Sequence, residues 1–275
     1  AMYRGSTKEH SDPLMRTYLE DLIYRLSETS EVRDRRFEFI ILEDKTINAF
    51  AAPGGIIGIN LGMFLNTERE GELASVMCHE LAHLSQRHFA RSQNRNSPLA
   101  NALMILGSIA VAAASRNPEA ILIAPAAMQQ MSINYTRSNE KEADRIGFNN
   151  LVKAGFDPND MTMMFQRMQD KYQNEDSEQF SYLMTHPLPS ERLTDMRIRA
   201  DGLKNNSKNS FRDNLDFYLM QKRAQVWAEK DIKELVKRFK KNLKSQNKNI
   251  EVSNRYGLSL AYKKNKDFEK SFGIL

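Results

Sequence analysis

The sequence predicts a mainly helical α+β protein with one small β-sheet and a helical C-terminal segment. Three short stretches, residues 37–42, 46–52 and 56–60, are rich in β-branched and aromatic residues, which predicts strands. Most of the remaining chain carries apolar residues at helical spacing. With 275 residues, 41% of them apolar, the chain can bury the core of one sizeable domain plus an appendage.

The first predicted element is a helix over residues 14–27, which follows a predicted flexible segment at residues 1–13. Its buried face is predicted from apolar residues four apart, namely Leu14, Tyr18, Leu22 and Leu26. The sequence Pro-Gly-Gly at residues 53–55 joins the second and third strands into a hairpin. The second strand is then expected to lie at an edge of the sheet.

The sequence His-Glu-Leu-Ala-His at residues 79–83 says the most about chemistry. Residues 67–70, Thr-Glu-Arg-Glu, have the form of a capping box and predict the start of a helix of about four turns. The apolar positions of this helix are Leu73, Val76, Met77, Leu81 and Leu84. Ionisable groups among apolar residues are costly unless something binds them. This setting favours a metal site over a surface helix with two solvated histidines.

Two histidines four apart project from one face of a helix, so the imidazoles of His79 and His83 can reach one metal ion. Glu80 lies about 100° round the helix from His79, where it can act on a water molecule without being a ligand. Zinc is the metal that favours such an imidazole pair. His88 is five residues past His83, and we expect it to face away as a surface residue.

A catalytic zinc site needs a third protein ligand, and residues 139–144, Asn-Glu-Lys-Glu-Ala-Asp, offer candidates on another predicted helix. Glu140 and Asp144 are four apart and share a face. One can bind the metal while the other accepts the spare ring N–H of a zinc-bound histidine. Glu142 points elsewhere and is the weaker candidate. The alternative is an exposed helix in which Glu140 pairs with Lys141; the histidine pair upstream favours the metal site.

The motif His-Glu-x-x-His followed some sixty residues later by Glu-x-x-Ala-Asp resembles the gluzincin group of metalloproteases that contains HtpX and the CAAX prenyl endopeptidases. Together the matching segments span about residues 40–200. Besides the two motifs, the segments that resemble this group are the hairpin at 48–62, Ala-Gly-Phe-Asp-Pro at 154–158 and His-Pro-Leu-Pro-Ser-Glu-Arg at 186–192.

The resemblance implies a zincin-type metalloprotease domain at residues 14–204 that holds one Zn²⁺ per chain. It implies that His79, His83 and Glu140 are the metal ligands. Asp144 then takes the supporting position, where it accepts a hydrogen bond from a ligand histidine.

The reaction implied is hydrolysis of a peptide bond by water. Glu80 would take the proton of the water and pass it to the leaving amine. The substrate is expected to lie extended along the edge strand, which favours unfolded or misassembled polypeptides over a strict sequence. The strand residues expected to make this contact are Asn48, Ala49, Phe50 and Ala51. The alternative is a chaperone-like scaffold or docking module with little proteolysis.

His186 lies in a stiff loop with prolines at 187 and 189. The resemblance implies that this loop lies near the active-site cleft and that His186 can occupy the fourth position of zinc, which would close the site. Activity would then require the loop to open. The alternative is a surface loop whose histidine has no role. Arg192 is expected either to contact bound peptide or a developing oxyanion, or to be a structural ion-pair partner.

The apolar runs at residues 99–114 and 120–131 fall below the roughly 20 residues that a membrane-spanning helix needs, so no transmembrane segment is predicted. The resemblance is then to the soluble, periplasmic branch of the group. That branch implies quality control of outer-membrane proteins, with their assembly machinery as a partner. The chain begins without a signal-peptide core, so the protein is either periplasmic with its leader removed or cytoplasmic.

Cys78 is the only cysteine in the chain, which excludes an internal disulfide but leaves the compartment open. Its position beside His79 invites comparison with a Cys–His nucleophile. Adjacent residues of a helix face different directions, however, so we expect Cys78 to be a small buried packing residue.

The polar sequence at residues 205–210 is the predicted domain boundary, followed by a helical region at 211–275. Residues 256–262 and 267–271 resemble part of a tetratricopeptide repeat, although Lys266 stands where that repeat usually has glycine. We expect this repeat array to be cut short at residue 275. Much of the net charge of +5 comes from lysines in this region. No base-stacking aromatic residues are interleaved with them, so a solvated helix face is expected and not a nucleic-acid site.

Overall fold

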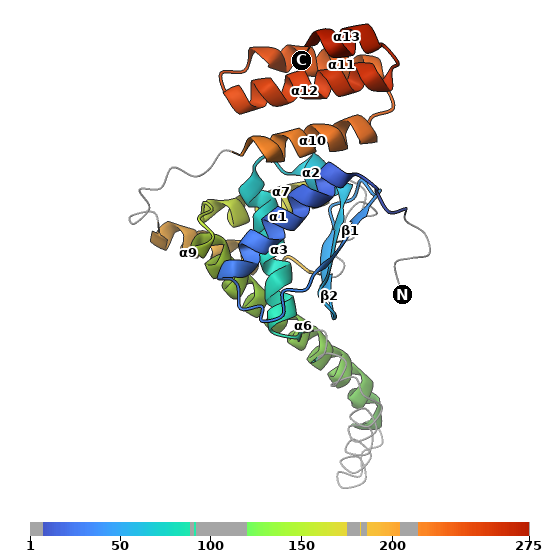
Figure 1. Ribbon diagram of the computed structural model, residues 1–275. Coiled ribbons are helices and arrows are strands. Elements are labelled where there is room, and N and C mark those ends of the chain that lie inside the picture. Colours follow the sequence, from blue (N-terminus) through green and yellow to red (C-terminus); the bar gives the residue numbers. More distant parts are fainter. Residues whose placement is uncertain are drawn as a thin grey trace.

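The computed structural model describes residues 8–88, 91, 120–174, 182, 186–203 and 214–274, without the side chains of 120–135 and 172–174. The fold is mainly helical with one three-stranded sheet, which confirms the predicted fold class. Helices pack beside the sheet, and the C-terminal helices stack at one end of the molecule (Figure 1). The described elements up to residue 203 are α1 (Pro13–Thr29), β1 (Glu38–Leu42), β2 (Ala49–Ala52), β3 (Ile56–Asn60), α2 (Leu61–Asn66), α3 (Glu70–Ser85), α6 (Ala120–Lys153), α7 (Asn159–Asn174) and α9 (Ser190–Leu203).

The sheet has the strand order β1–β3–β2, with β1 parallel to β3 and β2 antiparallel to it. The predicted hairpin is therefore confirmed, and β2 lies at an edge. Gly54 and Gly55 have positive φ angles of 92° and 80°, a conformation that glycine adopts without strain. A Cβ atom on Gly55 would also lie 2.1 Å from the carbonyl oxygen of Arg36.

Two main-chain hydrogen bonds tie the described residues before α1 to the strand β1 and the residues after it. The N–H of His10 donates to Ile41 O, and the N–H of Glu43 donates to Lys8 O. The main chain of these residues therefore pairs with β1 and the residues after it, and the predicted flexibility of the segment remains a prediction. The side chain of Asp12 caps α1 by accepting hydrogen bonds from the first helical N–H groups.

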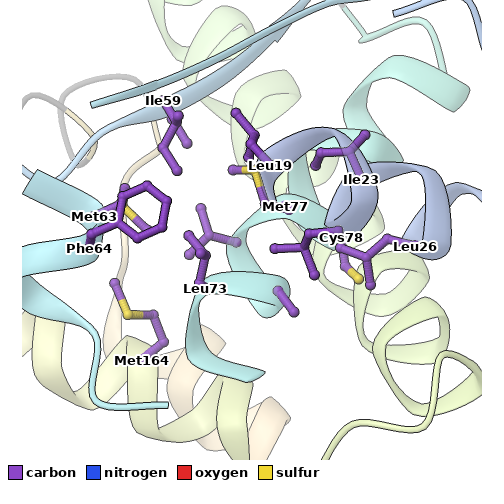
Figure 2. Close-up of a cluster of buried hydrophobic side chains, with 14 of the residues drawn as sticks. Leu19, Ile23, Leu26, Ile59, Met63, Phe64, Leu73, Met77, Cys78 and Met164 are labelled. Atoms are coloured by element: carbon purple, nitrogen blue, oxygen red, sulfur yellow. The ribbon is translucent and has the colours of Figure 1, made fainter. Parts of the chain in front are cut away.

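One core joins α1, the sheet, α2, α3 and α7, as Figure 2 shows with Leu19, Ile59 and Met164 among its members. Cys78 is fully buried in this core, as predicted, and burial raises the pKa of its thiol. Leu14 is 55% exposed, so the predicted buried face of α1 is wrong at its first residue. Steps of four residues advance 40° each round a helix, which places Leu14 about 120° from Leu26.

The helix that carries the His-Glu-Leu-Ala-His motif begins at Glu70, and residues 70–82 are all buried. The predicted capping box is not formed. Thr67 closes the preceding helix instead, donating from its hydroxyl to Met63 O. The carboxylate of Glu72 accepts the N–H of Glu68, 2.7 Å away, so a glutamate two residues after the predicted one caps the start of the helix.

The C-terminal helices are α10 (Leu215–Ala228), α11 (Ile232–Lys241), α12 (Lys248–Lys264) and α13 (Phe268–Ile274). Phe217, Met220 and Ala224 of α10 belong to the main core, whereas α11, α12 and the end of α10 form a second, smaller core. Lys266, at the turn into α13, has φ = 61°, which explains why glycine would suit that position.

Two sequence features lie outside the described residues, namely the predicted domain boundary at 205–210 and the apolar run at 99–114. The run at 120–131 belongs to α6. Among the described helices, none combines the length and apolarity needed to cross a membrane.

Candidate metal centre

Four side chains direct donor atoms toward a common point. His79 and His83 come from α3, Glu140 from α6, and His186 from the loop before α9. One donor atom from each lies within 4.8 Å of the others, and the described residues hold no second cluster of this kind. The Nε2 atoms of His79 and His83 are 2.9 Å apart, and they lie 3.3 and 3.2 Å from the carboxylate oxygens of Glu140.

The chemistry of this cluster fits a metal ion that favours nitrogen ligands, such as zinc. His79 is fully buried and Glu140 is 3% exposed, so the alternative of Glu140 on an exposed helix is wrong. Burial would raise the pKa of Glu140, but His186, His79 and His83 hold it well below its usual range. A buried carboxylate thus stays ionised among imidazoles, and a cation at their centre would satisfy both kinds of donor.

Asp144 lies directly behind the first histidine. Its Oδ1 is 2.9 Å from Nδ1 of His79, while Nε2 of that ring faces the cluster. Burial would raise the pKa of Asp144, but His79 and Arg192 hold it below its usual value. The carboxylate can therefore accept the spare N–H of His79, which is the supporting position expected from the sequence.

Arg192, the second residue after the start of α9, is buried against these carboxylates. Its Nε and Nη2 donate to Asp144 at 2.6 and 2.7 Å, and its Nη1 lies 2.9 Å from Glu140 Oε2. Nη1 also donates to the carbonyl oxygen of Pro187. All three nitrogens of the guanidinium group are engaged in these contacts, and the expected contact of Arg192 with a peptide or oxyanion remains a prediction.

Glu80 lies beside the cluster and is 2% exposed. Its Oε2 accepts the main-chain N–H of Ala51 at 3.2 Å, and its Oε1 is 3.5 Å from Nε2 of His186. The carboxylate is therefore held between the edge strand and the histidine cluster, and no donor atom of Glu80 belongs to the ligand set.

Among the strands that the structure describes, none pairs with the outer edge of β2, and this edge faces the Glu80 carboxylate. Asn60 N–H donates to Asn48 O, so Asn48 and Phe50 direct their main-chain groups toward β3. Hydrogen-bonding direction alternates along a strand, and the N–H and C=O of Ala49 and Ala51 therefore point away from the sheet. The bond from Ala51 to Glu80 confirms this direction for Ala51.

A cavity of about 1200 Å³ lies along this edge. Its walls include three of the four predicted strand residues and four residues of the centre: Asn48, Phe50, Ala51, Glu80, His83, Glu140 and His186. Ala49 is not among the lining residues, because its side chain is 1% exposed and belongs to the core. The contact expected of Ala49 with a substrate runs through its main chain and remains a prediction.

His88 is buried, and the expectation of a surface residue is wrong. Its Nδ1 lies 2.8 Å from Nδ1 of His83, and its Nε2 lies 3.0 Å from Oε2 of Glu142. The helical spacing argument fails because α3 ends at Ser85. Arg87 then adopts φ = 54°, which turns the chain back toward the helix.

Tyr182 is a residue of the site that the sequence did not reveal. Its ring stacks on His186 with a centroid distance of 4.6 Å and an interplanar angle of 25°. Its N–H donates to Ile47 O at 3.3 Å, and its carbonyl accepts the N–H of His186. The spacing of four residues between an aromatic ring and the histidine was the one available signal.

Comparison with known proteins agrees with this geometry. The model of peptidase family M48 matches residues 13–200, which contain all of the site residues described above. The chain belongs to peptidase family M48. This membership confirms the metalloprotease resemblance drawn from the two motifs.

Several curated relatives match the chain. The beta-barrel assembly-enhancing protease of Escherichia coli (strain K12) is 38% identical over 80% of this chain and 45% of that protein. A Vibrio cholerae protein provisionally given the same name is 39% identical over the whole of this chain and 57% of its own length. Mitochondrial metalloendopeptidase OMA1 of Schizosaccharomyces pombe is 27% identical over 70% of this chain and 56% of that protein. The chain spans about half the length of these relatives.

Proposed function

We propose that this chain carries a zinc-dependent endopeptidase site that hydrolyses unfolded or misassembled polypeptides. The observation that carries the proposal is the convergence of His79, His83 and Glu140 on one point, with Glu80 beside it and a free strand edge along the cavity. Zinc held by these three ligands would supply Lewis acidity, which acidifies water and polarises a carbonyl group.

Glu80 has the geometry of a general base. It lies next to the ligand cluster, and Ala51 N–H orients its carboxylate. It would accept a proton from the attacking water and deliver it to the leaving amine. Burial excludes bulk water, so the proton has few competing acceptors there.

The expected substrate is an extended polypeptide. The outward N–H and C=O of Ala49 and the C=O of Ala51 can pair with a peptide laid along β2, whereas the N–H of Ala51 is bound to Glu80. Such pairing depends on the main chain and not on the sequence of the peptide. A folded protein cannot present a strand in this way, which favours unfolded chains. Phe50 packs its ring over Gly58 and shapes the cavity wall beside that edge.

His186 is proposed to close the centre at rest as a fourth ligand. Its Nδ1 lies 3.4 Å from Nε2 of His79 and 3.0 Å from Glu140 Oε1. Tyr182 supports the closed position in two ways, by stacking on His186 and by bonding to Ile47 O, which belongs to the segment leading into β2. Opening of this loop would remove His186 from the fourth coordination position of zinc. It would also release Ile47 O from its hydrogen bond with Tyr182.

The names of the bacterial relatives support a role in quality control of outer-membrane β-barrel proteins. We propose that the protein acts in the periplasm, with the assembly machinery of those barrels as its partner and the C-terminal helices as the docking region.

The test combines metal analysis with cleavage of casein by wild type and Glu80→Gln. We expect wild type to contain about one zinc per chain and to cleave casein, with loss of both on chelation and recovery on zinc addition. Glu80→Gln should keep its zinc and lose cleavage. If Glu80→Gln loses cleavage but the protein keeps its function in the cell, the scaffold alternative is favoured. Wild type without bound zinc would refute the metal site.

A further inference from the structure

His88 is the one buried histidine of the described chain that lies outside the ligand cluster. It is 4% exposed, and its two ring nitrogens both have partners. Nδ1 faces Nδ1 of His83, and Nε2 faces the carboxylate of Glu142 on α6. Arg91 lies 3.4 Å from the same carboxylate oxygen. A histidine placed only to fill space does not require this ordered pair of contacts.

His83, His88 and Glu142 form a row of hydrogen-bonded side chains, and the proton positions along this row follow from the geometry. His83 directs Nε2 toward the ligand cluster, so a neutral ring that offers a lone pair there carries its proton on Nδ1. That N–H must donate to Nδ1 of His88. His88 then carries its own proton on Nε2, from which it donates to Glu142.

The two histidines of α3 are supported differently. His79 is backed directly by a carboxylate, Asp144, whereas His83 is backed by a neutral ring that is itself backed by a carboxylate. Both carboxylates come from α6, two residues apart. The same helix that supplies Glu140 therefore supports both histidines from behind.

We propose that His88, held by Glu142, is a positioning residue that fixes the tautomer and orientation of His83 and thereby raises the affinity of the centre for zinc. The inference rests on the proposed zinc site. Supporting hydrogen bonds of this kind change metal affinity by about 10–100-fold.

The experiment measures zinc affinity by chelator competition in wild type, His88→Leu, His88→Gln and Glu142→Ala. We expect His88→Leu to bind zinc about 10–100-fold more weakly than wild type. His88→Gln should recover most of this loss, because its amide oxygen can accept from His83 and its amide nitrogen can donate to Glu142. Glu142→Ala should lose affinity by a smaller factor. His10→Leu, at a histidine that pairs with Glu43 far from the centre, is the matched control and should bind like wild type.

A second measurement does not depend on activity or on a variant that folds. Nitrogen-15 NMR of histidine-labelled wild type should show the proton of His83 on Nδ1 and that of His88 on Nε2. Unchanged zinc affinity in folded His88→Leu, or a proton on Nδ1 of His88, would overturn the proposal. If His88→Leu does not fold, the proton positions from NMR and the zinc affinity of Glu142→Ala test the proposal instead. Absence of zinc binding by wild type would instead count against the proposed function.

Discussion

Behind His79, one guanidinium group holds two carboxylates in fixed positions. Arg192 donates to both oxygens of Asp144 and lies 2.9 Å from Glu140, so it fixes a proposed ligand and the residue that supports another. Burial would lower the pKa of Arg192, but Asp144 and Glu140 raise it, so the guanidinium charge is retained. Lysine has no planar fork and could not replace it.

At this scale the first prediction compares two neighbouring glutamates. Glu140→Ala should lower zinc occupancy far more than Glu142→Ala, because only the Glu140 carboxylate reaches both Nε2 atoms of the histidine pair. Asp144→Ala should weaken zinc binding by a smaller factor than Glu140→Ala, about 10–100-fold. Zinc content after gel filtration measures the occupancy of each variant, and chelator competition measures its zinc affinity. Equal retention in the two glutamate variants would remove Glu140 from the ligand set.

The second prediction concerns His186. His186→Ala should keep its zinc, because three protein ligands remain, and should cleave casein faster than wild type, with self-cleavage as a second sign. Zinc analysis and initial rates measured on the same preparation check this. A variant that retains zinc but is inactive would indicate that His186 stabilises the transition state, and the closed resting state would then be wrong.

Site residues could be predicted from their spacing only where one helix continued between them. Glu140 and Asp144 share a face of α6, as their spacing of four implies. His88 was missed because α3 ends between His83 and His88, and a left-handed residue reverses the chain. Tyr182 had only its spacing of four from His186 as a local signal, because its other contact, with Ile47, joins positions 135 apart in the chain.

At the scale of elements, the crossing of α3 and α6 sets the geometry of the centre. A Cβ atom on Gly147 would lie 3.0 Å from the Cα and N atoms of His79. The two backbones therefore touch where α6 presents its carboxylates to α3. The neighbouring atoms belong to the main chain and cannot turn aside as a flexible side chain would.

Gly147→Ala should therefore push α6 away from α3 by a few tenths of an ångström. We expect a loss of about 1–3 kcal/mol in the free energy of unfolding, as overpacking produces, together with weaker zinc binding. Urea unfolding and chelator competition measure the two effects. The control is Gly202→Ala in α9, where a Cβ atom would meet nothing within 4 Å. Similar behaviour of the two variants would show that the crossing tolerates a methyl group.

The strands illustrate what sequence pattern can and cannot decide. Composition and the Pro-Gly-Gly turn predicted all three strands to within three residues and the β2–β3 hairpin. The parallel pairing of β1 with β3 was not predictable, because it depends on packing against α1 and α3 and not on a turn. The capping box failed for a related reason, since Thr67 is taken up by the end of α2.

At the scale of the whole molecule, α10 joins the C-terminal helices to the body that carries the centre. Gln221 donates to Thr67 O, and Asn214 donates to Glu70. The first contact lies at the end of α2 and the second at the start of α3. The predicted division at residues 205–210 remains a prediction, but the core of the first part includes side chains of α10 that lie beyond it.

One buried carboxyl group couples the stability of the molecule to pH. Asp160, on the first turn of α7, is 1% exposed and lies against Gly71 of α3. Burial raises its pKa to about 7. Arg69, 3.4 Å away, opposes the shift, and Asp157 and Glu72 add to it. Folding therefore favours the protonated form of Asp160.

The sign of the resulting pH dependence follows from the raised pKa. The unfolded carboxyl titrates near pH 4, so between about pH 4 and 7 the folded state binds more protons, and the free energy of unfolding falls as pH rises. In wild type this fall in the free energy of unfolding amounts to up to about 4 kcal/mol, and Asp160→Asn should remove it. The variant should therefore be more stable than wild type at pH 8. Urea unfolding of wild type and variant in chelator, across this range, isolates the effect because metal loss is then common to both. The same substitution at exposed Asp170 on the same helix should leave the wild-type slope unchanged. Parallel curves for wild type and Asp160→Asn would show that Asp160 is ionised in the folded protein throughout the range.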